Sequence, residues 1–452
     1  MESLKAHFSW TVVFMLGLLS STGQGFLVNL TVLEAAARRG AVCLDGSPPA
    51  YHLAPGFGPG MNSWLVHIEF MGYGIISLSL SLSLYVSEWL LVISGGGWCH
   101  NITNCFARKV GRLGSSRAMG SIVFSGILSD RRDLNPEFYN WNRVKVAYCD
   151  GSSLTGDVDR VDPATNLHFR GARIFDAVME DLLRQGMRYA ESALLSGCSA
   201  GGLAAILHCD RFRALLAAAA RVKCLSDGGF FVNVRDVTGA EYMKSYFSEI
   251  VATHVPGRRE EPPSSCTSKM SPGMCFFPQY VVKQIRTPLF VLNAAYDSWQ
   301  IRNALLSPGS DPAGAWKECA SDMSLCDTSQ LEALQAFRMQ FLGALRGLGA
   351  SPAAGMFVNS CFAHCQTEMA EIWHFDGSPV LGNTTIAGAV AEWFYDRRPF
   401  KNVDCPYPCD SSCRNIRYVP EEFLPGENLH HKLRHLLMCS PRSHSISHGL
   451  ES

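Results

Sequence analysis

The chain has 452 residues, of which 47% are hydrophobic and 17% are charged. These proportions are typical of a globular protein with a sizeable core and exclude a disordered chain. Lysine and arginine number 39 against 40 acidic residues, so the net charge is close to zero. A dedicated nucleic-acid-binding protein would carry a basic excess, and we therefore expect no nucleic-acid partner.

Residues 1–25 have the layout of a secretory signal peptide. Lys5 gives a positive start, the apolar run from Phe8 to Leu19 is short for a membrane span, and Gly23 and Gly25 follow it. The alternative interpretation is an N-terminal core helix. We expect cleavage near Gly25 and a secreted, extracellular or cell-wall protein with no membrane span in its mature form.

Two further features favour secretion. The chain has 17 cysteines, many closely spaced, which is typical of a disulfide framework in an oxidising compartment. Three N-glycosylation sequons begin at Asn29, Asn101 and Asn383. A zinc site competes as an explanation of the cysteines, but no pair of C-x₂-C knuckles occurs, and we expect no metal. The local disulfides to expect first are Cys99–Cys105 and Cys319–Cys326.

Strand-like and helix-like segments alternate from Asn62 onward. Strands are predicted for residues 63–69, 143–150, 287–297 and 355–361. The segment from Arg170 to Met187 has its apolar residues at the spacing of one helical face. This alternation predicts an α/β fold, with a mostly parallel sheet flanked by helices in a single catalytic domain.

A possible nucleophile lies between the segments SALLSGCS and AGGLAAILHCD, which read as a strand followed at once by a helix. Residues 197–201, Gly-Cys-Ser-Ala-Gly, fit the G-x-S-x-G elbow, in which a sharp turn exposes the serine hydroxyl above the sheet. Alone the pattern is weak, because roughly one chain in five with 40 glycines would contain it by chance. The role of Ser199 therefore depends on the rest of the sequence.

A serine hydrolase of the α/β type also needs an acid and then a histidine later in the chain. The imidazole takes the proton of the serine, and the carboxylate holds the imidazole in the right tautomer. Asp297 follows a predicted strand, where the active sites of such sheets lie, and His364 follows a later strand. We predict Ser199, Asp297 and His364 as the catalytic residues.

Each of these assignments has an alternative. Asp297 could be the N-cap of a helix beginning at Ser298. His364 could be a structural histidine between two disulfide-bonded cysteines. The rival bases and the rival acid are His100, His208, His254, His374 and Asp227. Spacing alone leaves the choice open.

The segment GGGWC at residues 95–99 is in the position of the loop that faces the elbow in esterases. Glycines let backbone N–H groups approach a developing oxyanion without a side chain in the way. We predict donors from Gly96, Gly97 or Trp98, with the N–H of Ala200 completing the oxyanion hole. A flexible surface turn would explain the glycines but not the bulky tryptophan.

Several motifs together resemble a known family. They are LLSGCSAGGLAAILHCD, KCLSDGGFF, NAAYDSWQI, CFAHCQTE, YDRRPF and DCPYPC. From about Ala41 to Cys413 the chain closely resembles plant pectin acetylesterases, which are relatives of the Notum-type deacylases. The resemblance implies an α/β-hydrolase-like serine esterase that removes O-acetyl groups from galacturonan, with acetylated pectin as its partner and no cofactor. Motif by motif, it assigns the same catalytic and oxyanion residues as the spacing does.

Residues 70–94 depart from the family pattern, in which a strand like WLVHIE leads directly into GGGWC. Leu/Ser alternation would fit an added edge strand. A transmembrane helix would contain Glu88 and would place Ser199 in a reducing compartment, hostile to the disulfides. We favour a third interpretation, a translated dinucleotide repeat such as a retained intron would give. Sequencing of the transcript tests it, and uniform presence of the segment in mature messages would contradict it.

The insertion ends directly before the predicted oxyanion glycines and could displace them, and a small misplacement can cost about 100-fold in rate. Two alternatives to a pectin acetylesterase therefore remain: a deacylase for another carboxylic ester, and a catalytically disabled wall-binding homologue. The catalytic domain is predicted to span residues 26–415. The atypical tail, residues 416–452, is predicted to be disordered, and it contributes Cys439, without which the cysteine count is sixteen.

Overall fold

A computed structural model of the chain describes residues 25–69, 74–75, 91–92, 96–255, 264–349, 351–413 and 415. Three predicted features lie wholly or largely outside the described residues. They are the signal peptide, most of the insertion at residues 70–94, and the tail with Cys439.

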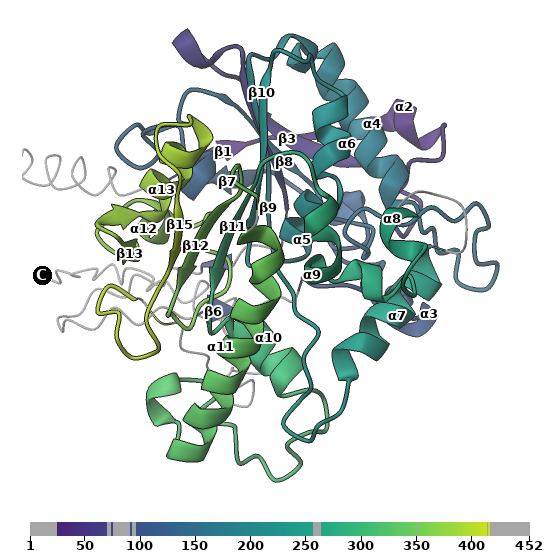
Figure 1. The fold of residues 1–452 in the computed structure, drawn as a ribbon. Coiled ribbons are helices and arrows are strands. Elements are labelled where there is room, and N and C mark those ends of the chain that lie inside the picture. Colours follow the sequence, from purple (N-terminus) through teal and green to yellow (C-terminus); the bar gives the residue numbers. More distant parts are fainter. Residues whose placement is uncertain are drawn as a thin grey trace, which may run out of the picture.

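Nine strands form the central sheet (Figure 1). In chain order they are β2 (Leu30–Val32), β3 (Ala50–Ala54), β4 (Ser63–Ile68), β8 (Asn142–Val146), β9 (Ser192–Cys198), β10 (Arg221–Asp227), β11 (Leu289–Ala294), β12 (Gly355–Asn359) and β15 (Lys401–Val403). Their order across the sheet is β15-β12-β11-β10-β9-β4-β8-β3-β2. The strands from β15 to β8 pair in parallel, and β3 and β2 add an antiparallel edge. The predicted mostly parallel sheet is therefore confirmed.

Helices cover both faces of this sheet. The helices that pack in the larger core cluster are α4 (Gly171–Arg184), α5 (Ala200–Leu207), α6 (Cys209–Ala214), α7 (Tyr242–His254), α9 (Pro278–Val281) and α11 (Thr328–Gly349). Those in the smaller cluster are α12 (Ala370–Trp373) and α13 (Ile386–Phe394), which lie across the sheet from α4 and α5 in Figure 1. Because strand side chains alternate, Leu194 of β9 belongs to the smaller cluster and Leu195 to the larger. The two clusters share one sheet and form one domain.

The remaining strands and α-helices are short. They are β1 (Phe26–Val28), α2 (Glu34–Ala37), β5 (Gly74–Ile75), β6 (Leu91–Val92), α3 (Ile102–Arg108), β7 (Ile122–Phe124), α8 (Ser264–Thr267), α10 (Ser298–Gln300), β13 (Val380–Leu381) and β14 (Thr384–Thr385). Strands β5 and β6 belong to the atypical insertion and form an antiparallel pair of their own. Among the described residues, no helix has the length and apolar character needed to cross a bilayer.

Eight disulfides join the sixteen cysteines other than Cys439, an even number that is compatible with full pairing. They are Cys43–Cys149, Cys99–Cys105, Cys198–Cys365, Cys209–Cys224, Cys266–Cys275, Cys319–Cys326, Cys361–Cys413 and Cys405–Cys409. Both local pairs that the sequence singled out are among them. Cysteines committed to disulfides offer no thiolate to a metal ion.

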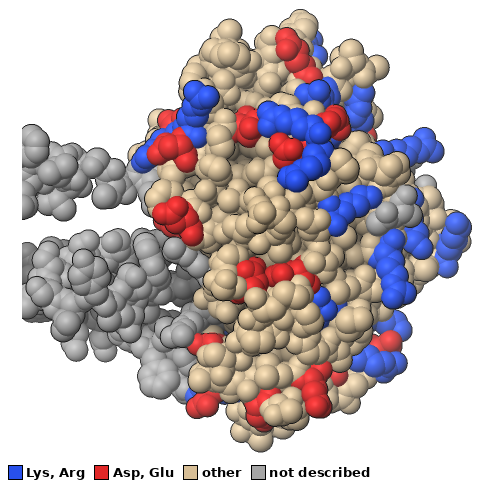
Figure 2. Space-filling view, turned by 60° about the vertical axis from the view of Figure 1, so that its left-hand side comes forward, with Lys and Arg blue, Asp and Glu red and all other residues tan. Residues whose placement is uncertain are grey.

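Figure 2 shows charged side chains of both signs on one face, with Lys and Arg more frequent toward the right-hand side and a broad uncharged area between the charged groups. This distribution agrees with the near-zero net charge of the chain. No field of a single sign covers this face.

Candidate active site

The elbow around Ser199 is a one-residue turn between β9 and α5, because the strand ends at Cys198 and the helix begins at Ala200. Ser199 has φ 55° and ψ −122°, a conformation that costs an ordinary residue about 1–3 kcal/mol and is typical of functional sites. A Cβ atom at Gly197 would lie 2.2 Å from the carbonyl oxygen of Gly201. The backbone is so close at this turn that the pattern requires glycine here.

Three side chains meet at the carboxyl edge of the sheet, where parallel α/β folds place their active sites. Ser199 follows β9, Asp297 follows β11, and His364 follows β12. The Nε2 atom of His364 lies 2.8 Å from the Ser199 hydroxyl oxygen, and its Nδ1 atom lies 2.8 Å from Asp297 Oδ2. With the proton on Nδ1, the imidazole can accept the serine proton while the carboxylate fixes its tautomer. All three residues are buried.

Asp297 also fills the alternative role considered for it. Its Oδ1 atom accepts the N–H of Gln300 at 2.9 Å and thereby caps helix α10, while Oδ2 faces His364. The two carboxylate oxygens thus have separate partners. The cap fixes the rotation of the carboxylate, so that one oxygen stays directed at the imidazole.

Three of the four rival histidines, His208, His254 and His100, lie against other groups. His208 and His254 are buried, and their Nε2 atoms lie 3.1 Å and 2.8 Å from backbone carbonyl oxygens. His100 Nε2 lies 3.8 Å from a glutamate carboxylate oxygen. Burial lowers the pKa of His374.

The rival acid, Asp227, holds the backbone beyond His364. Its Oδ2 atom accepts the N–H groups of Gln366 and Thr367 at 2.6 Å and 2.7 Å, and its own carbonyl oxygen accepts the N–H of Ser199 at 2.8 Å. Burial raises the pKa of this carboxyl group to about 6, and the bonds from Thr367 and Gln366 oppose the rise. Asp227 therefore connects the nucleophile elbow to the histidine loop, residues 364–368.

Three more contacts of the histidine loop reach different strands of the sheet. Cys365 forms a disulfide with Cys198, the last residue of β9. Glu368 Oε1 lies 2.9 Å from Nε2 of His67 on β4 and 3.2 Å from Nζ of Lys145 on β8. The position of the imidazole is thus set by the strands themselves and not by a free loop.

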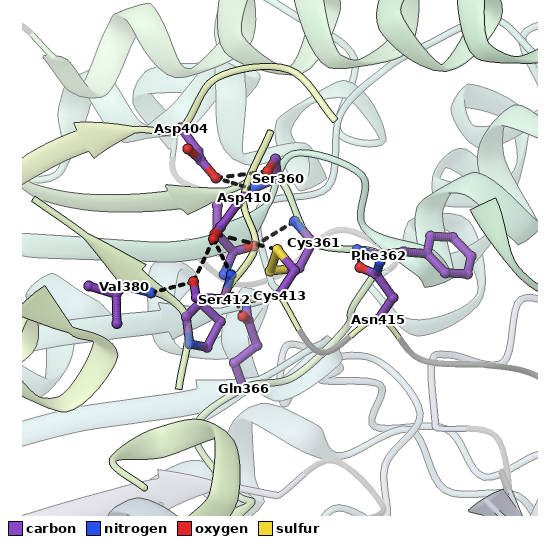
Figure 3. The surroundings of a disulfide bond; sticks show 12 residues. Ser360, Cys361, Phe362, Gln366, Val380, Asp404, Asp410, Ser412, Cys413 and Asn415 are labelled. Carbon is purple, nitrogen blue, oxygen red and sulfur yellow. Dashed lines mark hydrogen bonds between the residues drawn. A yellow bond between two sulfur atoms is a disulfide. The ribbon is translucent and has the colours of Figure 1, made fainter. Parts of the chain in front are cut away.

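The described C-terminal segment holds the residues between β12 and His364 in place (Figure 3). Cys413 forms a disulfide with Cys361, just after β12. Asp404 Oδ2 accepts the hydroxyl and the N–H of Ser360, and Asn415 Oδ1 accepts the N–H of Phe362 at 2.8 Å. Contacts therefore fix the chain both before and after His364.

The pKa of Glu368 provides a test of this anchoring. Burial alone would raise the pKa of this carboxyl group, but Lys145 and His67 outweigh that effect and lower the pKa to about 2. A carboxylate whose pKa is lowered by folding stabilises the fold at pH values above its pKa in the unfolded chain. This stabilisation is lost as the pH falls through the pKa of the folded state. A shift of this size corresponds to about 3 kcal/mol. We expect Glu368→Gln to unfold at lower urea concentration at pH 6, and the difference from the unmodified chain to shrink towards pH 2.5. An equal difference at both pH values would contradict the ion pairing.

The predicted oxyanion loop packs against the elbow through its tryptophan. Trp98 is buried, and its Nε1–H donates to Ser153 Oγ at 2.7 Å, which donates in turn to the carbonyl oxygen of Ala200 at 2.7 Å. Gly97 has φ 61°, the left-handed region that favours glycine. The N–H groups of Gly97, Trp98 and Ala200 make no hydrogen bond to another residue in the described part of the chain. Their role as oxyanion donors remains a prediction.

Aromatic side chains enclose the site on one side. The ring of Trp299 lies 6.3 Å from that of His364 at a small interplanar angle, and Trp98 and Phe231 pack edge-on against Trp299. Such a wall excludes water, which strengthens the hydrogen bonds of the triad.

The three sequon asparagines are exposed. Asn101 also caps α3, since its Oδ1 atom accepts the N–H of Asn104 at 2.8 Å. Glycosylation uses the side-chain nitrogen, so the cap and a glycan are compatible there. Modification at all three positions remains a prediction.

Sequence reasoning missed the residues that hold the triad in place. Asp227 was considered only as a rival acid, and the Cys198–Cys365 disulfide was not foreseen. A signal for the disulfide was present, because one cysteine precedes the proposed nucleophile and the other follows the proposed base.

The fold and the hydrogen-bonded row at its carboxyl edge are those of a carboxylic ester hydrolase of the α/β-hydrolase type. The family model "Pectinacetylesterase" matches the chain over residues 21–83 and 81–414. The chain is 48% identical to pectin acetylesterase 7 of Arabidopsis thaliana, covering 90% of this chain and 97% of the relative. Pectin acetylesterase 11 of the same plant is also 48% identical, over 85% and 92% of the two chains. Palmitoleoyl-protein carboxylesterase notum2 of Xenopus laevis is more distant, at 26% identity over 72% of this chain and 66% of that one. The chain belongs to the pectinacetylesterase family.

Proposed function

We propose that this chain hydrolyses O-acetyl esters of pectin, with Ser199 as nucleophile, His364 as general base and Asp297 as the acid that orients it. The observation that carries the proposal is the unbroken row of two 2.8 Å contacts from serine to imidazole to carboxylate. Its substrate is inferred from the relatives at 48% identity, whose names specify pectin acetyl esters.

The mechanism follows acyl transfer. Ser199 attacks the acetyl carbonyl carbon as His364 takes its proton, and the imidazolium then gives that proton to the departing sugar hydroxyl. The N–H groups of Gly97, Trp98 and Ala200 stabilise the negative oxygen of the tetrahedral intermediate. Water, activated by the same imidazole, then releases acetate and restores the serine. The overall reaction consumes one water and yields acetate and the free sugar hydroxyl.

Secretion is part of the same proposal. Eight disulfides need an oxidising compartment, and pectin lies in the cell wall outside the plant cell. Exposed sequons at Asn29, Asn101 and Asn383 are compatible with passage through the secretory route. Peptide mapping of the secreted protein, before and after enzymatic deglycosylation, tests the three sites and the cleavage near Gly25.

The test is the release of acetate from acetylated galacturonan by the secreted chain. Acetylated xylan and a palmitoleoylated peptide serve as comparison substrates, and a form lacking residues 70–94 is assayed in parallel. We expect acetate from galacturonan at the highest kcat/KM. Faster hydrolysis of the lipid ester would overturn the proposed substrate in favour of another acyl ester. Activity only in the shortened form would identify a family member that its insertion has disabled.

A further inference from the structure

The oxyanion loop is held from behind by side chains on each of four consecutive carbonyl oxygens, those of residues 96–99. Arg108 donates from Nη1 to the Gly96 carbonyl at 2.8 Å and from Nη2 to the Gly97 carbonyl at 3.2 Å. The Tyr148 hydroxyl also donates to the Gly97 carbonyl, at 3.1 Å. The Tyr246 hydroxyl donates to the Trp98 carbonyl at 3.1 Å, and His254 Nε2 lies 2.8 Å from the Cys99 carbonyl oxygen. Among the described residues, the N–H groups of Gly97 and Trp98 have no hydrogen-bond acceptor, whereas that of Cys99 donates to the Gly151 carbonyl oxygen at 3.1 Å. Arg108 is the residue that binds two of these carbonyls at once.

The two carbonyls on Arg108 belong to the peptide groups that carry the predicted donors. The Gly96 carbonyl shares its peptide group with the Gly97 N–H, and the Gly97 carbonyl shares its peptide group with the Trp98 N–H. In a trans peptide, the C=O and N–H bonds point in opposite directions. A cation on the oxygen therefore lies directly behind the N–H, and it draws electron density away from that donor.

We propose that Arg108 is a positioning residue that orients and polarises the two backbone donors of the oxyanion hole. The inference rests on the proposed function, because it assumes that Gly97 and Trp98 face the developing oxyanion. It assigns a role in the reaction to a residue that makes no contact with the substrate.

The surroundings of Arg108 keep the guanidinium in this orientation. Its Nε–H donates to the Leu113 carbonyl at 3.2 Å, and the guanidinium carbon lies 5.5 Å from the centre of the Tyr148 ring. Burial lowers the pKa of Arg108, whereas Tyr148 and Asp150 act in the opposite direction. An arginine keeps its proton at neutral pH, so the guanidinium remains a charged donor.

The planar fork of arginine is what this site requires. Two nitrogen atoms of one rigid group reach two successive carbonyl oxygens, and a third reaches Leu113. A lysine ammonium is a single point charge and cannot hold the same two carbonyls in fixed geometry. Arg108→Lys should therefore keep the charge and lose most of the orientation.

The experiment compares Arg108→Met and Arg108→Lys with the unmodified chain, and Arg117→Met is the matched control. Arg117 is exposed, and its ion-pair contact is with Asp45 at 3.4 Å. Loss of one direct oxyanion donor costs about 10²- to 10³-fold in kcat. For the indirect role of Arg108 we expect kcat to fall about 10- to 100-fold in Arg108→Met, with KM little changed. Arg108→Lys should recover only part of this loss, and Arg117→Met should behave like the unmodified chain.

A second measurement separates this role from simple support of the fold. A boronic acid that adds to Ser199 forms a tetrahedral anion whose oxygen occupies the oxyanion hole, so its affinity should fall in parallel with kcat. Unchanged boronate affinity in both Arg108 variants would overturn the proposal, as would a loss confined to KM. Should Arg108→Met fail to fold, the same comparison is made with Arg108→Lys. Boronate binding needs no pectin, so a failure of the proposed substrate would leave this test intact.

Discussion

Replacement of Ser199 by alanine should abolish acetate release, with a loss of about 10⁴-fold or more in kcat. The reason is that the hydroxyl oxygen is the atom proposed to form the acyl-enzyme, and alanine leaves His364 nothing to activate. Any residual rate would come from the oxyanion hole and substrate binding acting on water. The measurement is the initial rate of acetate release from acetylated galacturonan at neutral pH.

The strained elbow makes the control important, since Ser199 has a positive φ. Alanine tolerates that backbone no better than serine does, so the fold of Ser199→Ala should be checked by its unfolding midpoint. Ser199→Cys is the matched variant, because it keeps a nucleophilic atom at the same position. An alanine form that folds normally and still releases acetate would exclude Ser199 as the nucleophile.

Replacement of Asp297 by asparagine should lower kcat by about 10⁴-fold. An amide can still accept the N–H of Gln300 and cap α10, so the local fold should survive. The NH₂ group of the amide, however, would then replace Asp297 Oδ2, which now lies 2.8 Å from His364 Nδ1. Two donors cannot share that position, and the imidazole would be driven into the tautomer that cannot accept the serine proton. The pH dependence of kcat reports the change.

Asp227→Asn is the matched control, since Asp227 is the other buried carboxylate near His364. An asparagine there keeps an acceptor oxygen for the N–H groups of Gln366 and Thr367. It should cost some stability and retain most of the activity. If instead Asp227→Asn lost the activity and Asp297→Asn retained it, the two carboxylates would have to exchange roles.

The sequence predicted the parallel core of the sheet well, because buried strands and an amphipathic helix have strong local periodicity. Ile174, Val178 and Leu182 are buried in α4 at the predicted spacing. The edge strands β2 and β15 could not be predicted. Each has only three residues, which are too few to show an alternation of apolar and polar residues, and each is held by pairing with a neighbouring strand. Strand β10 was not predicted as a strand, although the family motif KCLSDGGFF overlaps its end.

The candidate site divides in a similar way. Ser199, Asp297 and His364 could be predicted because each follows a strand and the fold brings strand ends together. The partners of Arg108 could not, since hydrogen bonds from a side chain to distant carbonyls leave no pattern in the sequence. Asp297 shows why the alternatives stayed open. Its position after a strand favoured a catalytic acid, but the spacing also allowed a helix cap, and the structure gives it a cap contact and an imidazole contact together.

The Cys198–Cys365 disulfide joins two cysteines that are 167 residues apart in the chain. Each cysteine is the direct chain neighbour of a proposed catalytic residue, Ser199 or His364. A single proteolytic cut anywhere between residues 199 and 364 would leave Ser199 and His364 on fragments that are still linked. The other seven disulfides join other parts of the chain, and none of them links the nucleophile elbow to the histidine loop. A molecule cut once by a protease would therefore keep Ser199 and His364 covalently linked. The amount of intact chain on a reducing gel would then underestimate the amount of enzyme that is still active.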